Sequence, residues 1–269
     1  MTTLYDKNII GTSRKNYEDI PDLTDEIIAR CNEPDEPIKE VPKVNKKKGS
    51  NLENKAGESS RIINPLQDVN GYIYVPSLNL YFTKERILQG KNWYETHKEL
   101  QSNDQRMPTI PEFIEFLKYT KLNFQDIYKD ITEVRSPWRA EWLDADFKVK
   151  GKDLYINYNH IFSPNGNLIP KNSEILDKNT LMTDKTPGIS LDDYILKNHT
   201  SQGLPSKKVK SGDLYYWYPR DDNNSVARFV ANSDWAFLNC IRDPSDGVGG
   251  HGVFGIAQGI PPKLAGGKK

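Results

Sequence analysis

The chain has 269 residues, with 37 Lys or Arg and 37 Asp or Glu, so its formal net charge is zero. This balance gives no overall field that favours nucleic acid or an anionic membrane. No apolar run approaches the roughly 20 residues that span a bilayer. The mean hydropathy of −0.72 indicates that part of the chain lies outside a core.

The first residues show no secretory signal pattern, and the two cysteines, Cys31 and Cys240, are too few for a disulfide framework. A reducing compartment is the simpler expectation, so the cytoplasm is the default location. Display on a cell or virus surface would then require a partner that carries the protein there.

Residues 1–65 are predicted to form a disordered or extended arm. From Glu18 to Gly71 there is no aromatic residue, and Pro, Lys, Glu, Asn and Ser are abundant. Such a segment buries too little apolar surface to offset its ordering entropy. Within it, Asp22–Arg30 has helical spacing and is either a nascent helix or a helix that docks a partner. Lys46–Lys48 is read as part of a solvated linker.

The composition changes at about Gln67, and residues 66–260 are predicted to form one α+β domain, followed by a flexible tail at 261–269. All five tryptophans lie in this domain. Two helices are expected, at Asn92–Gln101 and Ile110–Tyr119. The first buries Trp93, His97 and Leu100, and the second buries Phe113, Phe116 and Leu117. Thr109 and Glu112 form a capping box for the second helix, and Pro111 fits its first turn.

The strands are predicted to be short and separated by long loops. Alternation and β-branched or aromatic residues indicate strands at Tyr72–Val75, Leu78–Phe82, Ala140–Phe147, Asp153–Tyr158 and Asp213–Pro219. Phe124–Asp130 indicates a further short helix. Phe162–Pro205 contains several Pro and Gly residues and is predicted to be loop-rich, and long loops are often functional.

The stretch Ser225–Ala257 contains no Lys, Glu, Gln, Met or Tyr, although Lys, Glu and Tyr are common elsewhere. Within it, Trp235–Arg242 alternates as a strand. One face carries Ala236, Leu238 and Cys240, which suits a core. The other carries Trp235, Phe237, Asn239 and Ile241, which indicates either a recognition surface or a strand covered on both faces.

Other side chains suggest little chemistry. The four histidines, His97, His160, His199 and His251, have no metal-ligand spacing, so zinc is not expected. His97 is expected to pack on a helix face, and His251 is expected in an exposed loop.

The carboxylate pairs Asp144/Asp146, Asp192/Asp193 and Asp221/Asp222 leave calcium binding open as a minor alternative. Cys240 is expected to be buried and inert. The run Gly247–Gly252 precedes a strand, so a flexible loop is favoured over a nucleotide site.

Two segments resemble a known family. Arg106–Phe116 (RMPTIPEFIEF) is similar to the R-L-P-T-E-x-E-W/F helix entry of the C-type lectin fold in its formylglycine-generating, or sulfatase-modifying, branch. Arg228–Phe254 is similar to that branch's closing R-x-x-x-R…G-F-R region. Within the branch, the chain resembles the archaeal-type variable proteins of diversity-generating retroelements. That resemblance rests on Ser225–Phe229, Ser233, Asp234, Ala236, Leu238, Cys240, Arg242–Pro244, Gly252 and Val253.

The resemblance implies a constant scaffold that displays diversified side chains within the variable region 225–257. The scaffold positions would be Ala227, Phe229, Ala231, Ala236, Leu238 and Cys240, and Arg242 would pair with Asp243 at the base of the loop. Diversified asparagine codons give no Lys, Glu, Gln, Met or Trp, so Trp235 departs from the pattern and would need a different template codon or an invariant position. Phe254 is a second departure, because the family pattern more often has Arg there. The displayed, ligand-binding positions would be Val230, Asn232, Trp235, Phe237, Asn239, Ile241, Ser245, Asp246, Gly247, Val248, Gly249, Gly250 and His251.

The sequence therefore predicts a non-enzymatic binding protein whose ligand is a protein or another macromolecule, with no catalytic residues, cofactor or metal. Two alternatives stay open. An enzyme of the formylglycine-generating type needs reactive cysteines near this end of the fold, where the chain has only Cys240. A fixed-specificity, calcium-dependent lectin needs Glu-Pro-Asn, Gln-Pro-Asp or Trp-Asn-Asp motifs, which are absent.

Overall fold

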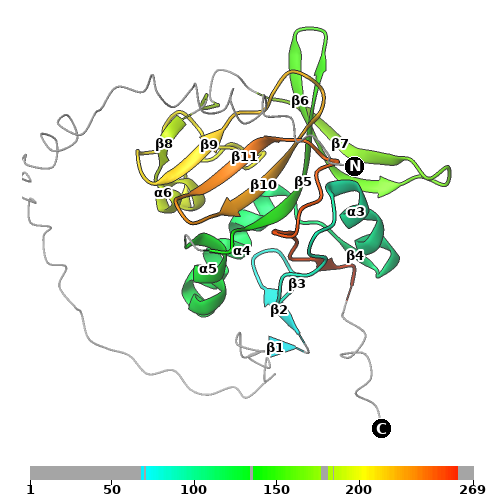
Figure 1. Ribbon diagram of the computed structural model, residues 1–269, viewed down its shortest axis with the longest axis horizontal. Helices are drawn as coiled ribbons and strands as arrows, with labels where there is room; N and C mark the ends of the chain where they lie inside the picture. The colour runs from blue at the N-terminus through cyan, green and yellow to red at the C-terminus, as the bar shows by residue number, and fades with distance from the viewer. Residues whose placement is uncertain (1–67, 70, 134–135, 177–180, 184, 260–269) are drawn as a thin grey trace, which may run out of the picture. The chain divides into compact units, whose positions relative to one another are not determined.

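A computed structural model of the chain describes residues 68–69, 71–133, 136–176, 181–183 and 185–259 (Figure 1). The predicted arm at 1–65, with Asp22–Arg30 and Lys46–Lys48, lies outside the described residues, as does the tail at 261–269. The described residues belong to a compact unit that spans residues 61–269. No helix in its described part is long and apolar enough to cross a membrane.

The unit is α+β and contains two sheets with four helices among the described residues. The larger sheet has the strand order β7-β6-β5-β10-β11-β9-β8, and β12 pairs with β5. Its strands are β5 (Arg139–Lys150), β6 (Asp153–Phe162), β7 (Leu168–Ile175), β8 (Lys185–Ile189), β9 (Leu214–Trp217), β10 (Ser225–Ala231), β11 (Ala236–Arg242) and β12 (His251–Gly252).

The smaller sheet has the order β1-β2-β3-β13-β4. It joins residues from both ends of the unit, because β13 pairs with both β3 and β4. Its strands are β1 (Asp68–Val69), β2 (Tyr72–Val75), β3 (Leu80–Thr83), β4 (Gln105–Arg106) and β13 (Ile256–Ala257).

The predicted helices are confirmed. Helix α3 spans Trp93–Ser102, and Trp93, His97 and Leu100 are buried in it. Helix α4 spans Ile110–Asn123, begins at the predicted Thr109–Glu112 capping box and buries its predicted aromatic stripe. Helix α5 (Gln125–Thr132) follows, where a short helix was expected. These elements form where their local signals lie, since caps and apolar spacing act within one or two turns.

The loop-rich segment Phe162–Pro205 contains regular elements that the sequence did not reveal. These are β7, β8 and helix α6 (Leu191–Leu196). Most of β7 is exposed, and it is the end strand of its sheet, paired with β6. Pro170 is compatible with a strand there, because an edge strand tolerates a residue that donates no hydrogen bond.

Strand β10 lies between β5 and β11, and all seven of its residues are buried (Figure 1). Ala227 and Phe229 join a cluster that contains α4, and the Phe229 and Phe113 ring centroids are 5.8 Å apart. Val226 joins a second cluster with Trp93 and Trp142. Strand β10 is therefore covered on both faces, and burial alone accounts for its lack of Lys and Glu.

Candidate ligand-binding surface

Strand β11 is more deeply buried on one face than on the other. Leu238 and Cys240 are buried, which confirms the predicted core face, and Ala236 packs against the same cluster while partly exposed. On the opposite face Phe237 and Ile241 are half-buried. The alternative of a strand covered on both faces is therefore wrong for β11, although it describes β10.

The half-buried side chains of β11 continue onto β9. In the parallel pairing of these strands, Phe237 is opposite Tyr215 and Asn239 is opposite Trp217. Just before β11, the Trp235 ring lies against that of Tyr215, with centroids 5.1 Å apart. We call the resulting surface the β9–β11 face. It consists of the half-buried residues Tyr215, Trp217, Trp235, Phe237 and Ile241.

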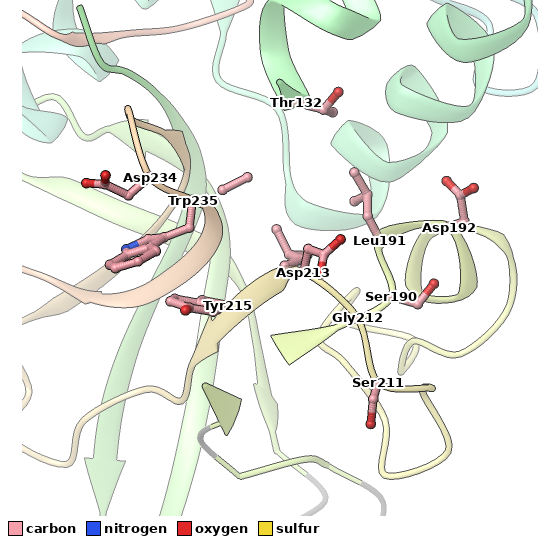
Figure 2. A pocket seen from close by; sticks show the side chains of 12 residues that line it. Thr132, Ser190, Leu191, Asp192, Ser211, Gly212, Asp213, Tyr215, Asp234 and Trp235 are labelled. Atoms are coloured by element: carbon pink, nitrogen blue, oxygen red, sulfur yellow. The ribbon is translucent and has the colours of Figure 1, made fainter. Parts of the chain in front are cut away.

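A hollow adjoins each end of the β9–β11 face. At the Trp235 end, a hollow of about 560 Å³ is lined by Tyr215 and by carboxylates that include Asp213 and Asp234. Figure 2 shows Trp235 and Tyr215 side by side, with Ser190, Leu191 and Asp192 across the hollow from them. At the other end, Trp217 and Ile241 border a hollow of about 720 Å³. The aromatic surface is therefore recessed at both ends.

Two predicted display positions are buried, which corrects the sequence-based assignment. Val230 is 2% exposed and Asn239 is 8% exposed. Val230 pairs with Phe237 of β11 on one side and with Ala140 of β5 on the other, so neighbouring strands flank it on both sides. The Asn239 side chain accepts a hydrogen bond from the backbone N–H of Ile241 at 3.0 Å.

Asn232 is half-buried and holds the turn between β10 and β11. Its side-chain oxygen accepts hydrogen bonds from the backbone N–H groups of Asp234 and Trp235, at 2.9 and 2.8 Å. Its own N–H donates to the Trp235 carbonyl at 3.1 Å. Asn suits this position because its short side chain bonds to nearby backbone. The turn fixes where the Trp235 ring leaves the chain.

Asp243 organises the loop that comes after β11. Its carboxylate accepts hydrogen bonds from the backbone N–H and the hydroxyl of Ser245, at 2.8 and 2.7 Å, and from the Asn224 amide at 2.9 Å. Arg242 forms its ion pair with Asp246. The expected Arg242–Asp243 ion pair is thus replaced by the Arg242–Asp246 ion pair and by the hydrogen bonds of Asp243, and both stabilise the base of the loop.

Positions 248 and 249 of this loop face open space, whereas a side chain at position 247 would be confined. Val248 is 40% exposed, and a side chain at Gly249 would meet nothing within 4 Å. A Cβ at Gly247 would lie 3.1 Å from the Gly90 carbonyl oxygen, which is a tight contact. Ser245 is exposed and Asp246 half-buried. The structure therefore leaves room for different side chains here.

The last two predicted display positions of the loop are enclosed. A Cβ at Gly250 would lie 2.7 Å from ring atoms of Trp138. His251 is 0% exposed, so the expectation of an exposed histidine is wrong. Its ring stacks on Trp142 with centroids 4.2 Å apart and nearly parallel planes (3°). Arg86 donates a hydrogen bond to the Gly250 carbonyl at 2.8 Å, so this end of the loop is anchored.

Arg228 holds His251 in its neutral form. The Arg228 Nη1 group and His251 Nε2 are 2.5 Å apart, and a guanidinium can only donate. Burial and the charges of Arg228, Arg242 and Arg86 lower the pKa of His251 to about 3. Burial, with Arg242 nearby, also lowers the pKa of Arg228 to about 9. The buried Arg228 Nε has no hydrogen-bond partner among the described residues.

A second polar cluster was missed by the sequence-based reasoning. His97 of α3, Asp144 of β5 and His160 of β6 place one donor atom each within 4.8 Å of one another, and all three are buried. His160 Nδ1 is 2.5 Å from Asp144 Oδ1, and His160 Nε2 is 3.5 Å from Asp146 Oδ1. The sequence feature that could have revealed this cluster is the Asp144/Asp146 pair, because residues two apart lie on the same face of a strand.

The two histidines of this cluster differ in charge. Burial lowers the pKa of His97 to about 4, against the opposing effect of Asp144. Burial also disfavours charge on His160, but its hydrogen bonds to Asp144 and Asp146 outweigh burial and raise its pKa to about 9. At neutral pH the cluster therefore holds a neutral His97 beside a charged His160.

The remaining candidates are structural. Cys240 is buried, as expected. Phe254 is buried and packs against Phe116, with ring centroids 5.2 Å apart, so it belongs to the core. Asp193 accepts hydrogen bonds from Lys210 N–H and the Asn198 amide, and this accounts for one carboxylate of the Asp192/Asp193 pair.

Comparison of the chain with protein-family models, with curated proteins and with solved structures found no match.

Proposed function

We propose that this chain is a non-enzymatic binding protein that presents a diversified surface on a C-type lectin-fold scaffold. The observation that carries the proposal is the uneven burial of β11: Leu238 and Cys240 are closely packed on the inner face, whereas Phe237 and Ile241 are half-buried on the outer face beside aromatic residues of β9. Its ligand would be a protein or another macromolecule, bound by the β9–β11 face and the exposed part of the 245–249 loop.

The side chains of the β9–β11 face suit recognition. Trp, Tyr and Phe bury a large area at low conformational cost, and they are enriched where interfaces concentrate their binding energy. Trp235 and Phe237 are the expected anchors. The neighbouring loop offers small side chains at Ser245 and Gly249 that could be exchanged without disturbing the core.

The scaffold part of the proposal is supported by the motif that suggested it. Arg106 forms two hydrogen bonds to the Glu112 carboxylate, at 2.7 and 2.6 Å, and the same Glu112 accepts from Thr109. The motif therefore works as one unit that ties β4 to the start of α4. Pairing of β13 with β3 and β4 brings the end of the domain back to its beginning.

The enzyme alternative is less well supported. Chemistry of the formylglycine-generating type needs an accessible, reactive thiol, and Cys240 is 0% exposed on the inner face of β11. A buried thiol in apolar surroundings is held in its unreactive form. Turnover of a thiol-containing peptide would revive this alternative, and calcium-dependent glycan binding would revive the fixed-specificity lectin.

The decisive experiment is to sequence the DNA that flanks the gene in several clones. We expect a second copy of the segment coding for 225–254 that differs from the gene only at adenines. The burial of each position narrows where differences should fall. We expect them at Phe237, Ile241, Ser245, Asp246, Val248 and Gly249, with Arg228, Phe229, Gly250, His251 and Phe254 constant. Absence of a second copy, or mismatches spread over all four bases, would contradict the proposal.

A further inference from the structure

The geometry of the second polar cluster points to a site for one Zn²⁺ ion. We propose that His97, Asp144 and His160 bind this ion and thereby fasten α3 to β5 and β6. Each residue offers one donor atom, and the three atoms lie within 4.8 Å of one another. Two imidazoles and a carboxylate form a common ligand set for zinc. The site is separate from the β9–β11 face.

An unpartnered atom aims into this site. His97 is 4% exposed, and its Nε2 has no hydrogen-bond partner among the described residues. Asp144 Oδ1 is 3.6 Å from this nitrogen, which is too far for a hydrogen bond. Zn²⁺ bound at about 2.0–2.2 Å holds tetrahedral ligands roughly 3.3 Å apart, so the ion fits this separation better than a proton does.

The histidine rings are held in place by packing. Trp93 makes edge contacts with both rings, at centroid distances of 4.3 Å to His97 and 5.0 Å to His160. The backbone N–H of His160 donates to Asp144 Oδ2 at 3.1 Å, which orients the carboxylate. Such supporting contacts are typical of residues that position metal ligands. The short His160–Asp144 contact must widen by roughly an ångström to admit the ion.

A fourth ligand has room beside Asp144. This residue lines a cavity of about 60 Å³ together with Thr109, Tyr158 and Gln202. That volume is enough for a water molecule, and within a mostly apolar lining Thr109, Tyr158 and Gln202 offer hydrogen bonds to one. A zinc ion with three protein ligands and one water would complete the usual coordination number of four.

The test uses the full chain, stripped with a chelator and then dialysed against Zn²⁺. We expect about one ion per chain by mass spectrometry of the metal, a higher unfolding temperature with Zn²⁺ than with Mg²⁺, and visible ligand-field absorption when Co²⁺ replaces Zn²⁺. His97→Gln should abolish retention and the Co²⁺ absorption. His199→Gln is the matched control, because His199 lies outside the cluster and bonds to the Thr200 carbonyl; it should retain the ion.

Two results would overturn the site. One is a folded wild-type chain, judged by circular dichroism, that retains no Zn²⁺ and shows no Zn²⁺-dependent rise in unfolding temperature. The other is equal retention by a folded His97→Gln chain, which would place the ion elsewhere. If His97→Gln does not fold, the wild-type unfolding temperatures and the Co²⁺ spectrum, which distinguishes nitrogen ligation from oxygen-only ligation, decide the question.

Discussion

Strands β10 and β11 are neighbours that share the same restricted composition, yet the restriction has a different cause in each. In β10 every residue is buried, so the lack of Lys and Glu follows from packing on both faces. In β11 and the loop after it, half-exposed positions also lack these residues. Composition alone is therefore ambiguous, and only the burial of each position separates a scaffold strand from a displayed one.

A matched pair of phenylalanine substitutions tests most sharply whether β10 and β11 differ in packing. Phe229→Ala in β10 should lower the free energy of unfolding by about 3–5 kcal/mol, because it leaves a cavity in the core. Phe237→Ala in β11 should cost only about 1 kcal/mol, the size of a cross-strand contact. Denaturant unfolding of both variants measures the difference. Equal losses would mean that the two strands are packed alike.

A second matched pair compares neighbouring glycines of the loop. Gly250→Ala should cost about 1–3 kcal/mol, because the new methyl group meets the Trp138 ring at 2.7 Å. Gly249→Ala meets nothing within 4 Å and should leave the stability almost unchanged. Thermal unfolding of the two variants gives the measurement. If Gly250→Ala leaves the stability unchanged, position 250 can accept other side chains and belongs among the displayed positions after all.

The third prediction concerns pH and the anchored end of the loop. The pKa of His251 lies near 3 instead of its usual 6.5, so the folded state binds fewer protons than the unfolded state between these values. The contribution of His251 to stability is therefore full above pH 6.5 and is lost as the pH falls toward 3.

His251→Gln keeps an acceptor for Arg228 but cannot take up a proton. We expect this variant to be less stable at neutral pH and to lose less stability than the wild type between about pH 7 and about pH 5. Thermal unfolding of both proteins at the two pH values tests this, and the contributions of His97 and His160 cancel in the comparison. A wild-type loss no larger than that of the variant would rule out a buried neutral His251.

The smallest effect is expected at the exposed tip of the loop. Val248→Thr should change the free energy of unfolding by no more than about 0.5 kcal/mol, since this side chain is 40% exposed. Denaturant unfolding is again the measurement. A loss of unfolding free energy above about 1 kcal/mol is the size expected for a buried residue. Such a loss would show that Val248 is packed against the rest of the protein and that other side chains cannot replace it freely.

Local signals predicted the helices and the two faces of β11. A capping box and a period of two act over a few residues, so Thr109, Glu112, Leu238 and Cys240 could be placed from sequence alone. Strand β7 was missed because its exposed side chains and Pro170 hide the alternation that normally reveals a strand.

Long-range packing explains the errors in the candidate site. Gly250 and His251 are enclosed by Trp138 and Trp142, which lie more than a hundred positions earlier in the chain. Val230 is covered in the same way by neighbouring strands. The cluster of His97 with His160 needed the same knowledge, because no local spacing connects a helix with a strand of another part of the domain.

The placement of β12 and β13 has a consequence for protein synthesis. Both strands come after the variable loop, and β13 lies between β3 and β4 in the smaller sheet. During synthesis the smaller sheet therefore cannot close before residues 256–257 emerge from the ribosome. If the loop codons are diversified as proposed, they keep the pyrimidine at the end of each asparagine codon and cannot become stop codons. Every member of the repertoire therefore retains the strand that closes the smaller sheet.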